Sequence, residues 1–416
     1  MTTVTTTAAT ARTARRALWR NRDFVLLWSG QTVSSLGSRM SATAVPLLVL
    51  AMTGSPATAG VIGFLGGLPQ LLVQLPAGAL VDRWNRWRTM LISDVGRLLV
   101  VASLPAAWWL GWLTITQVAI VAFLESTFLV FFHLAENAAL PMVVSAGSVP
   151  IALAQNEAKT RGAALAGRPL GGLLFGFDRA LPFVADAVSY ALSTVTLLLM
   201  RRRDLAPPPV EARESLWREI VSGVRWLARH SFLRNAALLV AGSNLIFQAL
   251  TLAVIVLAEQ RGASPALIGV VLGCWGCGGL LGSFIAPWLQ PMIPPRAVVI
   301  GVNWVWVALL PLLLLPQEPL LIGLVGGATA FIGPLWNVVI GAYMLTLVPN
   351  QLLGRVSSTT GLLAQGALPF GSLIGGLLLE WHGPAGAIWA LSGFMLAIAI
   401  AASLSPSVRH APPLPG

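Results

Sequence analysis

The chain has 416 residues, of which 56% are hydrophobic and only 10% are charged, and its formal net charge is +11. A soluble globular protein carries roughly 25% charged residues, so this composition excludes the soluble classes and indicates a chain that crosses a membrane many times. The positive charge does not indicate a nucleic-acid partner, because the basic residues are concentrated in the tails and in alternate loops.

Long apolar runs predict an all-α integral membrane protein with twelve membrane-spanning helices of about 20 residues each. Most of the 26 Lys and Arg residues then fall in the two tails and the even-numbered loops. By the positive-inside rule, both termini lie in the cytoplasm. Nearly all the basic residues are arginine, which is typical of GC-rich bacterial genomes, so we expect a bacterial cytoplasmic (inner) membrane. The predicted helices start near Phe24, Ala57, Met90, Ile115, Ile151, Leu181, Asn235, Ala266, Val298, Leu320, Leu353 and Pro384.

The apolar and polar segments divide the chain into five parts. Trp217, Val221, Val224 and Leu227 recur at helical intervals within the longest polar segment, which predicts an amphipathic, basic helix on the inner leaflet. That segment is either a tether between two bundles or a regulatory, partner-binding element. The parts are a basic cytoplasmic tail (1–23), a six-helix bundle (24–200), a cytoplasmic linker (201–234), a second six-helix bundle (235–404) and a cytoplasmic C-terminal tail (405–416).

The two bundles carry traces of a common sequence. At an offset of 209 residues, Ser55-Pro56-Ala57 matches Ser264-Pro265-Ala266, and Gly60-Val61 matches Gly269-Val270. Duplicated halves are typical of transporters whose substrate site lies near the middle of the membrane.

A charged loop follows the second apolar run. Such charges cost several kcal/mol each in hydrocarbon, so the loop lies at a membrane surface. The spacing Gly78-x-x-x-Asp82-Arg83-x-x-Arg86-x-Arg88 resembles the loop between helices 2 and 3 of major facilitator superfamily transporters. The resemblance implies a charge network that latches the cytoplasmic side between transport states. A generic basic turn is the alternative.

Charged residues also occur inside the predicted spans of the first half. A charge within the membrane needs a partner, an aqueous cavity or a function. Counting about 1.5 Å per residue from the cytoplasmic ends places Arg97 and Glu125 at similar depths, and Asp94 lies one turn from Arg97. We therefore expect an Asp94–Arg97–Glu125 cluster. The full set is Arg39, Asp94, Arg97, Glu125, Arg168 and Asp186.

Proton coupling requires a carboxylate whose charge depends on its partner and its hydration. Glu125 is our first candidate for the coupling acid and Asp186 the second. Arg168 and Asp186 flank the turn between helices 5 and 6, where we expect them to meet. An arginine does not release its proton, so Arg39 can steer an acid or an anion but cannot carry a proton. Static pairs that fasten helices remain the alternative.

The predicted fifth helix is rich in glycine and contains a proline. Antiporter branches of the superfamily have a Gly-Pro-rich fifth helix, and the resemblance implies that it bends and packs against the opposite half. Glycines permit close approach and proline frees a carbonyl. The residues in question are Gly167, Pro169, Gly171 and Gly172, with Arg168 standing where a Gly-Pro motif has its glycine.

No cofactor site is indicated. Cys274 and Cys277 lie in an apolar, glycine-rich run, where close packing is the simpler explanation, and no second pair completes a zinc site. The single lysine, Lys159, precedes Thr160 but lacks the glycines of a phosphate-binding loop. We expect neither metal nor nucleotide, which leaves an ion gradient or facilitated diffusion as the driving force, and the family resemblance implies a proton gradient.

Short stretches in the first half are similar to the drug and siderophore exporters of the superfamily, a branch that includes macrolide-efflux and enterobactin-export proteins. They include Asn21-Arg22-Asp23-Phe24, Leu36-Gly37-Ser38-Arg39-Met40, Ala139-Leu140-Pro141 and Leu181-Pro182-Phe183. The resemblance implies a secondary transporter in two pseudo-symmetric bundles. It would export a lipophilic small molecule in exchange for protons that enter the cell. We expect the protein to be a monomer in contact with membrane lipids.

Three other functions remain as alternatives. Uptake and lipid movement use the same fold, and a receptor or scaffold would keep the bundle without transport. An enzyme is disfavoured, because His133 and Glu136 form only a lone pair one turn apart.

Overall fold

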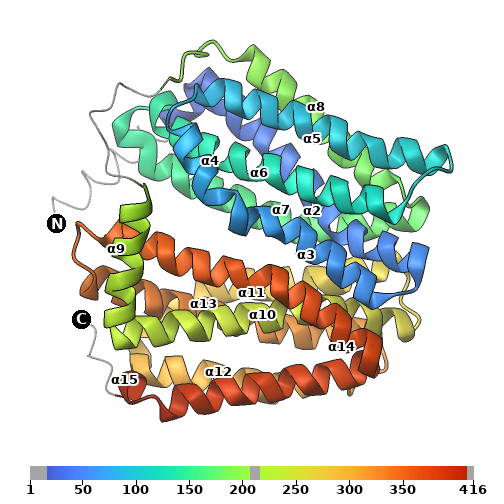
Figure 1. Cartoon of the computed structure of the whole chain (residues 1–416), viewed down its shortest axis with the longest axis vertical. Coiled ribbons are helices and arrows are strands. Elements are labelled where there is room, and N and C mark those ends of the chain that lie inside the picture. The colour runs from blue at the N-terminus through green and yellow to red at the C-terminus, as the bar shows by residue number, and fades with distance from the viewer. Residues whose placement is uncertain (1–15, 207–215, 410–416) are drawn as a thin grey trace. The chain divides into compact units, whose positions relative to one another are not determined.

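The computed structural model of the chain describes residues 16–206 and 216–409, and every regular element in these ranges is a helix (Figure 1). The outermost parts of the predicted tails, 1–15 and 410–416, and the Pro207–Pro209 run lie outside the described residues. The α-helices are α2 (Arg22–Thr53), α3 (Pro56–Leu72), α4 (Gln74–Val81), α5 (Arg86–Trp109), α6 (Ile115–Val143), α7 (Val149–Phe177), α8 (Leu181–Leu199), α9 (Leu216–Arg229), α10 (Ser231–Gln260), α11 (Pro265–Leu289), α12 (Pro295–Leu312), α13 (Pro319–Leu347), α14 (Leu353–Leu404) and α15 (Pro406–Arg409), with single 3₁₀ turns at Ala146–Ser148 and Gln290–Met292.

Nine of the described helices are long and apolar enough to cross a membrane, and the bent pair α3–α4 makes ten. The 52-residue α14 contains two of the predicted spans, and α7, with 29 residues, lies where the fifth was expected. All twelve predicted starts therefore fall within helices. The all-α, multi-pass architecture is confirmed, and the helices are consistent with twelve spans.

Proline explains both helix breaks. Pro76 has no N–H to donate to the carbonyl of Leu72, which is where α3 ends, and the axis then bends by 44° into α4. In α14, Pro384 disfavours the helical conformation of the residue before it, and Gly383 adopts a φ of 65°, which glycine tolerates without strain.

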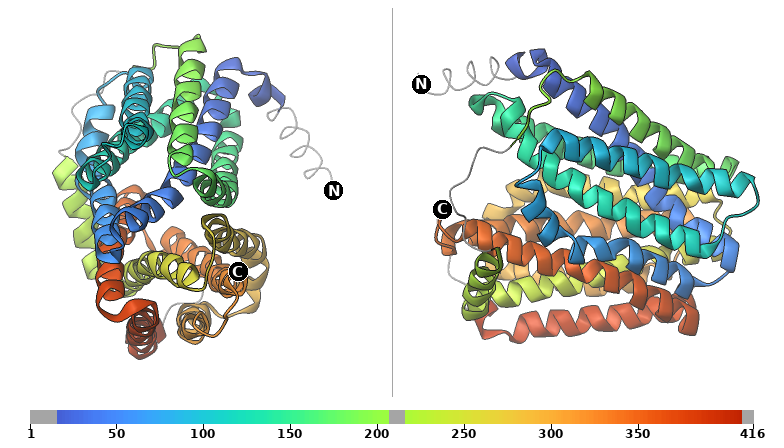
Figure 2. Two further views of the ribbon diagram at one scale, coloured as in Figure 1. Left: turned by 90° about the vertical axis from the view of Figure 1, so that its right-hand side faces the viewer. Right: turned by 45° about the horizontal axis from the view of Figure 1, so that its top comes forward.

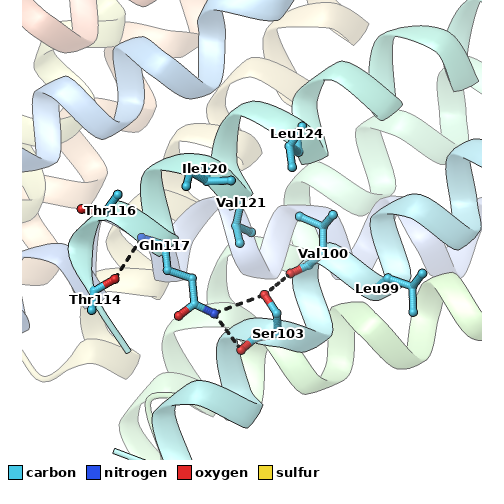
Figure 3. A pocket seen from close by; sticks show the side chains of 9 residues that line it. All are labelled: Leu99, Val100, Ser103, Thr114, Thr116, Gln117, Ile120, Val121 and Leu124. Atoms are coloured by element: carbon cyan, nitrogen blue, oxygen red, sulfur yellow. Dashed lines mark hydrogen bonds between the residues drawn. The ribbon is translucent and has the colours of Figure 1, made fainter. Parts of the chain in front are cut away.

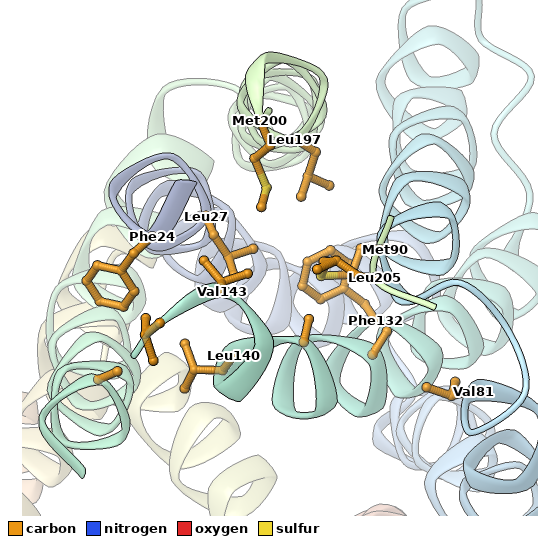
Figure 4. Packing of buried hydrophobic residues seen from close by; sticks show 14 of the residues in the cluster. Phe24, Leu27, Val81, Met90, Phe132, Leu140, Val143, Leu197, Met200 and Leu205 are labelled. Atoms are coloured by element: carbon orange, nitrogen blue, oxygen red, sulfur yellow. The ribbon is translucent and has the colours of Figure 1, made fainter. Parts of the chain in front are cut away.

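Of the described residues, 16–44 and 72–206 form one compact unit. Within it α5 packs against α6 and α8, as Figure 1 shows. Near one end of these helices Phe24, Met90, Phe132 and Leu197 belong to one cluster of buried apolar residues (Figure 4). The segment after α8 returns to this cluster through Leu205, which fixes the end of the unit that carries the charged loop.

Residues 45–71 and 216–409 form a second compact unit, where α10 packs along α14 and α11 along α13. In the left view of Figure 2 several helices of this unit, coloured yellow to orange, are seen nearly end-on. Small residues allow α11 and α13 to meet backbone to backbone, since a Cβ on Gly278 would lie 1.9 Å from the carbonyl oxygen of Gly327. Residues 45–71 pack in this unit although the sequence places them in the first bundle. The bundle boundaries at residues 200 and 235 stay a prediction.

The linker contains the expected helix, α9. Gly223 brings it close to the start of α14, where a Cβ would lie 2.7 Å from the carbonyl oxygen of Arg355. Leu227 is buried, whereas Arg225 and Arg229 are exposed. This distribution is amphipathic, and the position of α9 on a membrane leaflet stays a prediction.

Candidate functional site

A buried charge cluster lies between α5 and α6. Arg97 of α5, 1% exposed, donates from Nε and Nη2 to Oε1 of Glu125 on α6, at 3.2 and 3.1 Å. Its Nη1 lies 3.7 Å from Oδ1 of Asp94, one turn earlier on the same helix. The structure thus brings together the three residues expected to cluster, and their role in proton coupling stays a prediction.

Neutral partners complete the coordination of Arg97, and the sequence did not identify them. Its Nη2 also donates to the hydroxyl of Tyr190 at 2.7 Å and to Oγ of Ser38 at 2.9 Å. The guanidinium carbon lies 4.1 Å from the centre of the Tyr190 ring. Tyr190 in turn donates to Oε1 of Glu125 at 3.1 Å. Arg97 therefore connects α2, α5, α6 and α8, and a buried arginine of this kind is stable only because its donors are occupied.

Asp94 is held by a second chain of hydrogen bonds. Ser193 of α8 donates to its Oδ2 at 2.5 Å, and Gln31 of α2 donates to the Ser193 hydroxyl at 2.7 Å. All three side chains are buried. In contrast, the side chain of Glu125 is 23% exposed. Glu125 is therefore the most exposed member of the cluster.

Asp186, the second candidate acid, is 1% exposed near the start of α8. Gly37 of α2 packs directly over it, since a Cβ there would lie 2.7 Å from Oδ1 of Asp186. Ser189 donates to its backbone carbonyl at 2.7 Å. Arg168 and Arg39 lie half-buried in the same unit, and the pairing of Arg168 with Asp186 stays a prediction.

The glycines of α7 pack against α2. A Cβ on Gly167 would lie 2.5 Å from Cβ of Arg39, and one on Gly171 would lie 2.6 Å from the carbonyl oxygen of Met40. Gly172 is also buried, and α7 stays helical through Pro169. Close approach to the first helix accounts for Gly167 and Gly171, and contact of this helix with the opposite half stays a prediction.

We expect Gly171→Ala to lower the thermal stability of the protein, by about 1–3 kcal/mol, because the new methyl group meets backbone that cannot rotate away. Gly162→Ala is the matched control, since it lies on the same helix and its Cβ would meet open space. The midpoint of thermal unfolding in detergent measures both variants. Equal midpoints would contradict this packing.

The charged loop is built around two helix ends. Asp82 ends α4, its N–H donating to the carbonyl of Gly78 at 3.0 Å. Asn85 caps α5 by accepting from the N–H of Arg88 at 3.2 Å. Arg86 turns inward, is 8% exposed and donates to Sδ of Met142 at 3.0 Å, whereas Arg83 and Arg88 are exposed. A Cβ on Gly78 would meet open space. The latch function of these five residues stays a prediction.

A buried ion pair between α6 and α7 was not predicted from the sequence. Nζ of Lys159 lies 2.7 Å from Oε1 of Glu136, and both side chains are about 5% exposed (4% and 5%). His133, 55% exposed, approaches the other carboxylate oxygen at 3.6 Å. The sequence does contain an indication of this pair, because the single lysine of an arginine-rich chain lies inside a predicted span and needs a partner there.

A groove of about 470 Å³ runs between α5 and α6 at the end nearest their connecting turn (Figure 3). Gln117 crosses it and donates to the carbonyl of Ser103 at 3.1 Å. The charge cluster does not line it. The lining residues are Leu99, Val100, Ser103, Thr114, Thr116, Gln117, Ile120, Val121 and Leu124.

The family model and the similar sequences indicate the same family. A family model described as transmembrane secretion effector, within the major facilitator superfamily, matches residues 13–412. The multidrug efflux pump Tap of Mycolicibacterium fortuitum is 27% identical, with 93% of this chain and 96% of the relative covered. Macrolide efflux protein A of Streptococcus pyogenes is 23% identical, with 86% and 89% covered. The solved nucleoside transporter NupG is similar in fold, with a TM-score of 0.75, 11% identity and coverage of 92% of this chain and 100% of that chain.

Proposed function

Because this chain belongs to the transmembrane secretion effector family of major facilitator transporters, we propose that it exports a hydrophobic or amphipathic small molecule by proton-coupled alternating access. The membrane would be the bacterial cytoplasmic membrane, with both termini in the cytoplasm. Relatives named for multidrug and macrolide efflux support export of drug-like compounds.

One observation supports proton coupling: Glu125, which is partly exposed, is hydrogen-bonded to the buried Arg97. Ionised Glu125 accepts three hydrogen bonds on one oxygen, two from Arg97 and one from Tyr190. Hydrogen bonds to a charged acceptor are roughly twice as strong as neutral ones. Protonation of Glu125 would weaken all three at once.

The remaining bonds of Arg97 would persist after protonation. Arg97 keeps its charge, and its contacts with Asp94, Ser38 and Tyr190 hold α2, α5 and α8 together. Only the link to α6 loosens. A proton would therefore change the relative stability of two arrangements of α6, which is what coupling to alternating access requires.

The interior of the second half is apolar and aromatic. Its mid-span side chains include Trp275, Trp306 and Trp336, all less than 10% exposed, and Trp306 packs edge-on against Phe247 at 4.8 Å. Apolar, aromatic surroundings with few polar groups are typical of sites for lipophilic ligands.

The direction of transport separates export from uptake. Cells that lack their own efflux pumps, and that express the chain, should accumulate less of a lipophilic macrolide than cells with an empty vector. The measurement is intracellular drug at steady state, with and without a protonophore. Higher accumulation than the vector control would favour uptake, and equal accumulation across a panel of lipophilic compounds would favour a receptor or scaffold.

A further inference from the structure

One acidic side chain of α14 reaches the beginning of α3. Glu380 is exposed and lies three residues before the break at Gly383. Its Oε2 accepts from Oγ of Ser55 at 2.9 Å and from the N–H of Ala57 at 3.1 Å. Both helices lie in the second compact unit, although the sequence places α3 in the first bundle and α14 in the second.

The chemistry of this contact is that of a helix cap supplied by another helix. The first N–H groups of a helix lack intrahelical acceptors, and a carboxylate beside them is favoured by the helix dipole. Ser55 accepts from the N–H of Thr58 at 3.2 Å, and Pro56 at the first helical position has no N–H to satisfy. Glu380 satisfies the next free N–H, that of Ala57, and so completes the cap.

Below the cap the two helices are in backbone contact. A Cβ on Gly60 would lie 2.6 Å from the carbonyl oxygen of Ser372, and one on Gly376 would lie 2.6 Å from the carbonyl oxygen of Pro56. At Gly63 it would lie 2.9 Å from Cβ of Ser372. Ser372 is 6% exposed, so this seam is closed to solvent beneath Glu380.

We propose that Glu380 is a positioning residue that clamps the start of α3 onto α14, and that the clamp releases in each transport cycle. This inference rests on the proposed transport by alternating access. The short α2–α3 turn and the turn at Gly383 both belong to odd-numbered loops, which the charge distribution places outside. The clamp therefore closes the outer side.

Labelling of a buried cysteine tests the clamp without any substrate. Cys274 and Cys277, the only cysteines, are replaced by alanine, and Ser372→Cys supplies a near-isosteric reporter under the cap. An impermeant maleimide is added outside intact cells. When opening precedes labelling, the rate follows the open population. Loss of a charged cap should raise that rate about fivefold to tenfold in Glu380→Ala, and less in Glu380→Gln, which keeps a neutral acceptor.

Glu318→Ala is the matched control. Glu318 is an exposed acid at the beginning of α13, in another odd-numbered loop, and its side chain makes no cap hydrogen bond. Its removal should leave the labelling rate of the reporter unchanged. Equal rates in Glu380→Ala and Glu318→Ala would overturn the proposal.

A reversible cross-link tests whether release is required. Ser55→Cys with Glu380→Cys, in the cysteine-free background, should be joined by a short bifunctional methanethiosulfonate reagent, which makes up the length by which cysteine is shorter than glutamate. The cross-link should stop drug export, and reduction should restore it. Full export by the cross-linked protein would refute the release step, and absence of a cross-link in the folded protein would refute the contact. Labelling that responds to Glu380→Ala while no compound is exported would keep the clamp and reject the proposed function.

Discussion

Replacing Arg97 with leucine should abolish drug export and markedly destabilise the protein. The substitution leaves Asp94 and Glu125 without their cation, and Tyr190 and Ser38 without their donor. Removing one partner of a buried ion pair costs about 3–5 kcal/mol. The expected result is a large drop in the unfolding midpoint in detergent, together with export at the level of the empty vector.

One variant separates charge from geometry in this prediction, and a second variant is its control. Arg97→Lys keeps the charge but cannot reproduce the fork of donors, so we expect it to fold better than Arg97→Leu and still to export poorly. Arg161→Ala removes an arginine from an exposed pair with Glu157, where surface ion pairs contribute about 0–1 kcal/mol, and should change little. Wild-type export by Arg97→Leu would show that the cluster is dispensable.

Lys159→Ala should be the most destabilising change at the contact between α6 and α7. It leaves the carboxylate of Glu136 buried without its ammonium partner, a loss of about 3–5 kcal/mol. Lys159→Met combined with Glu136→Gln removes both charges and should regain most of the lost stability, because replacing a whole buried pair is often neutral.

Unfolding midpoints of Lys159→Met, Glu136→Gln and the double variant form a cycle with the wild type that measures the coupling. A double variant as unstable as the sum of the single variants would mean that Lys159 and Glu136 contribute independently. That outcome would contradict the ion pair as the reason for their burial.

The positions of the helices were predictable because hydropathy and helical spacing are local properties of a sequence. Asp94 and Arg97 lie on one helix face, and counting depth along two adjacent spans was enough to bring Glu125 to the same level. These predictions needed only the rise per residue and the order of the spans.

Contacts that depend on helix rotation were not predictable in the same way. Tyr190 and Ser193 face Arg97 and Asp94 only because of how α8 is rotated against α5, which packing decides rather than the sequence of either helix. Neutral hydroxyl groups also do not stand out in an apolar run as charges do. The contact of Ser55 with Glu380 joins residues 325 apart, and no local pattern indicates it.

Substrate-evoked proton movement tests the central claim most directly. Inverted membrane vesicles are given a proton gradient, and a lipophilic macrolide is added while a pH-sensitive dye reports proton release. We predict release with the wild type and with Glu157→Gln, which alters an exposed acid, and none with Glu125→Gln. Full release with Glu125→Gln would contradict Glu125 as the coupling acid, and drug transport without any proton release would contradict antiport.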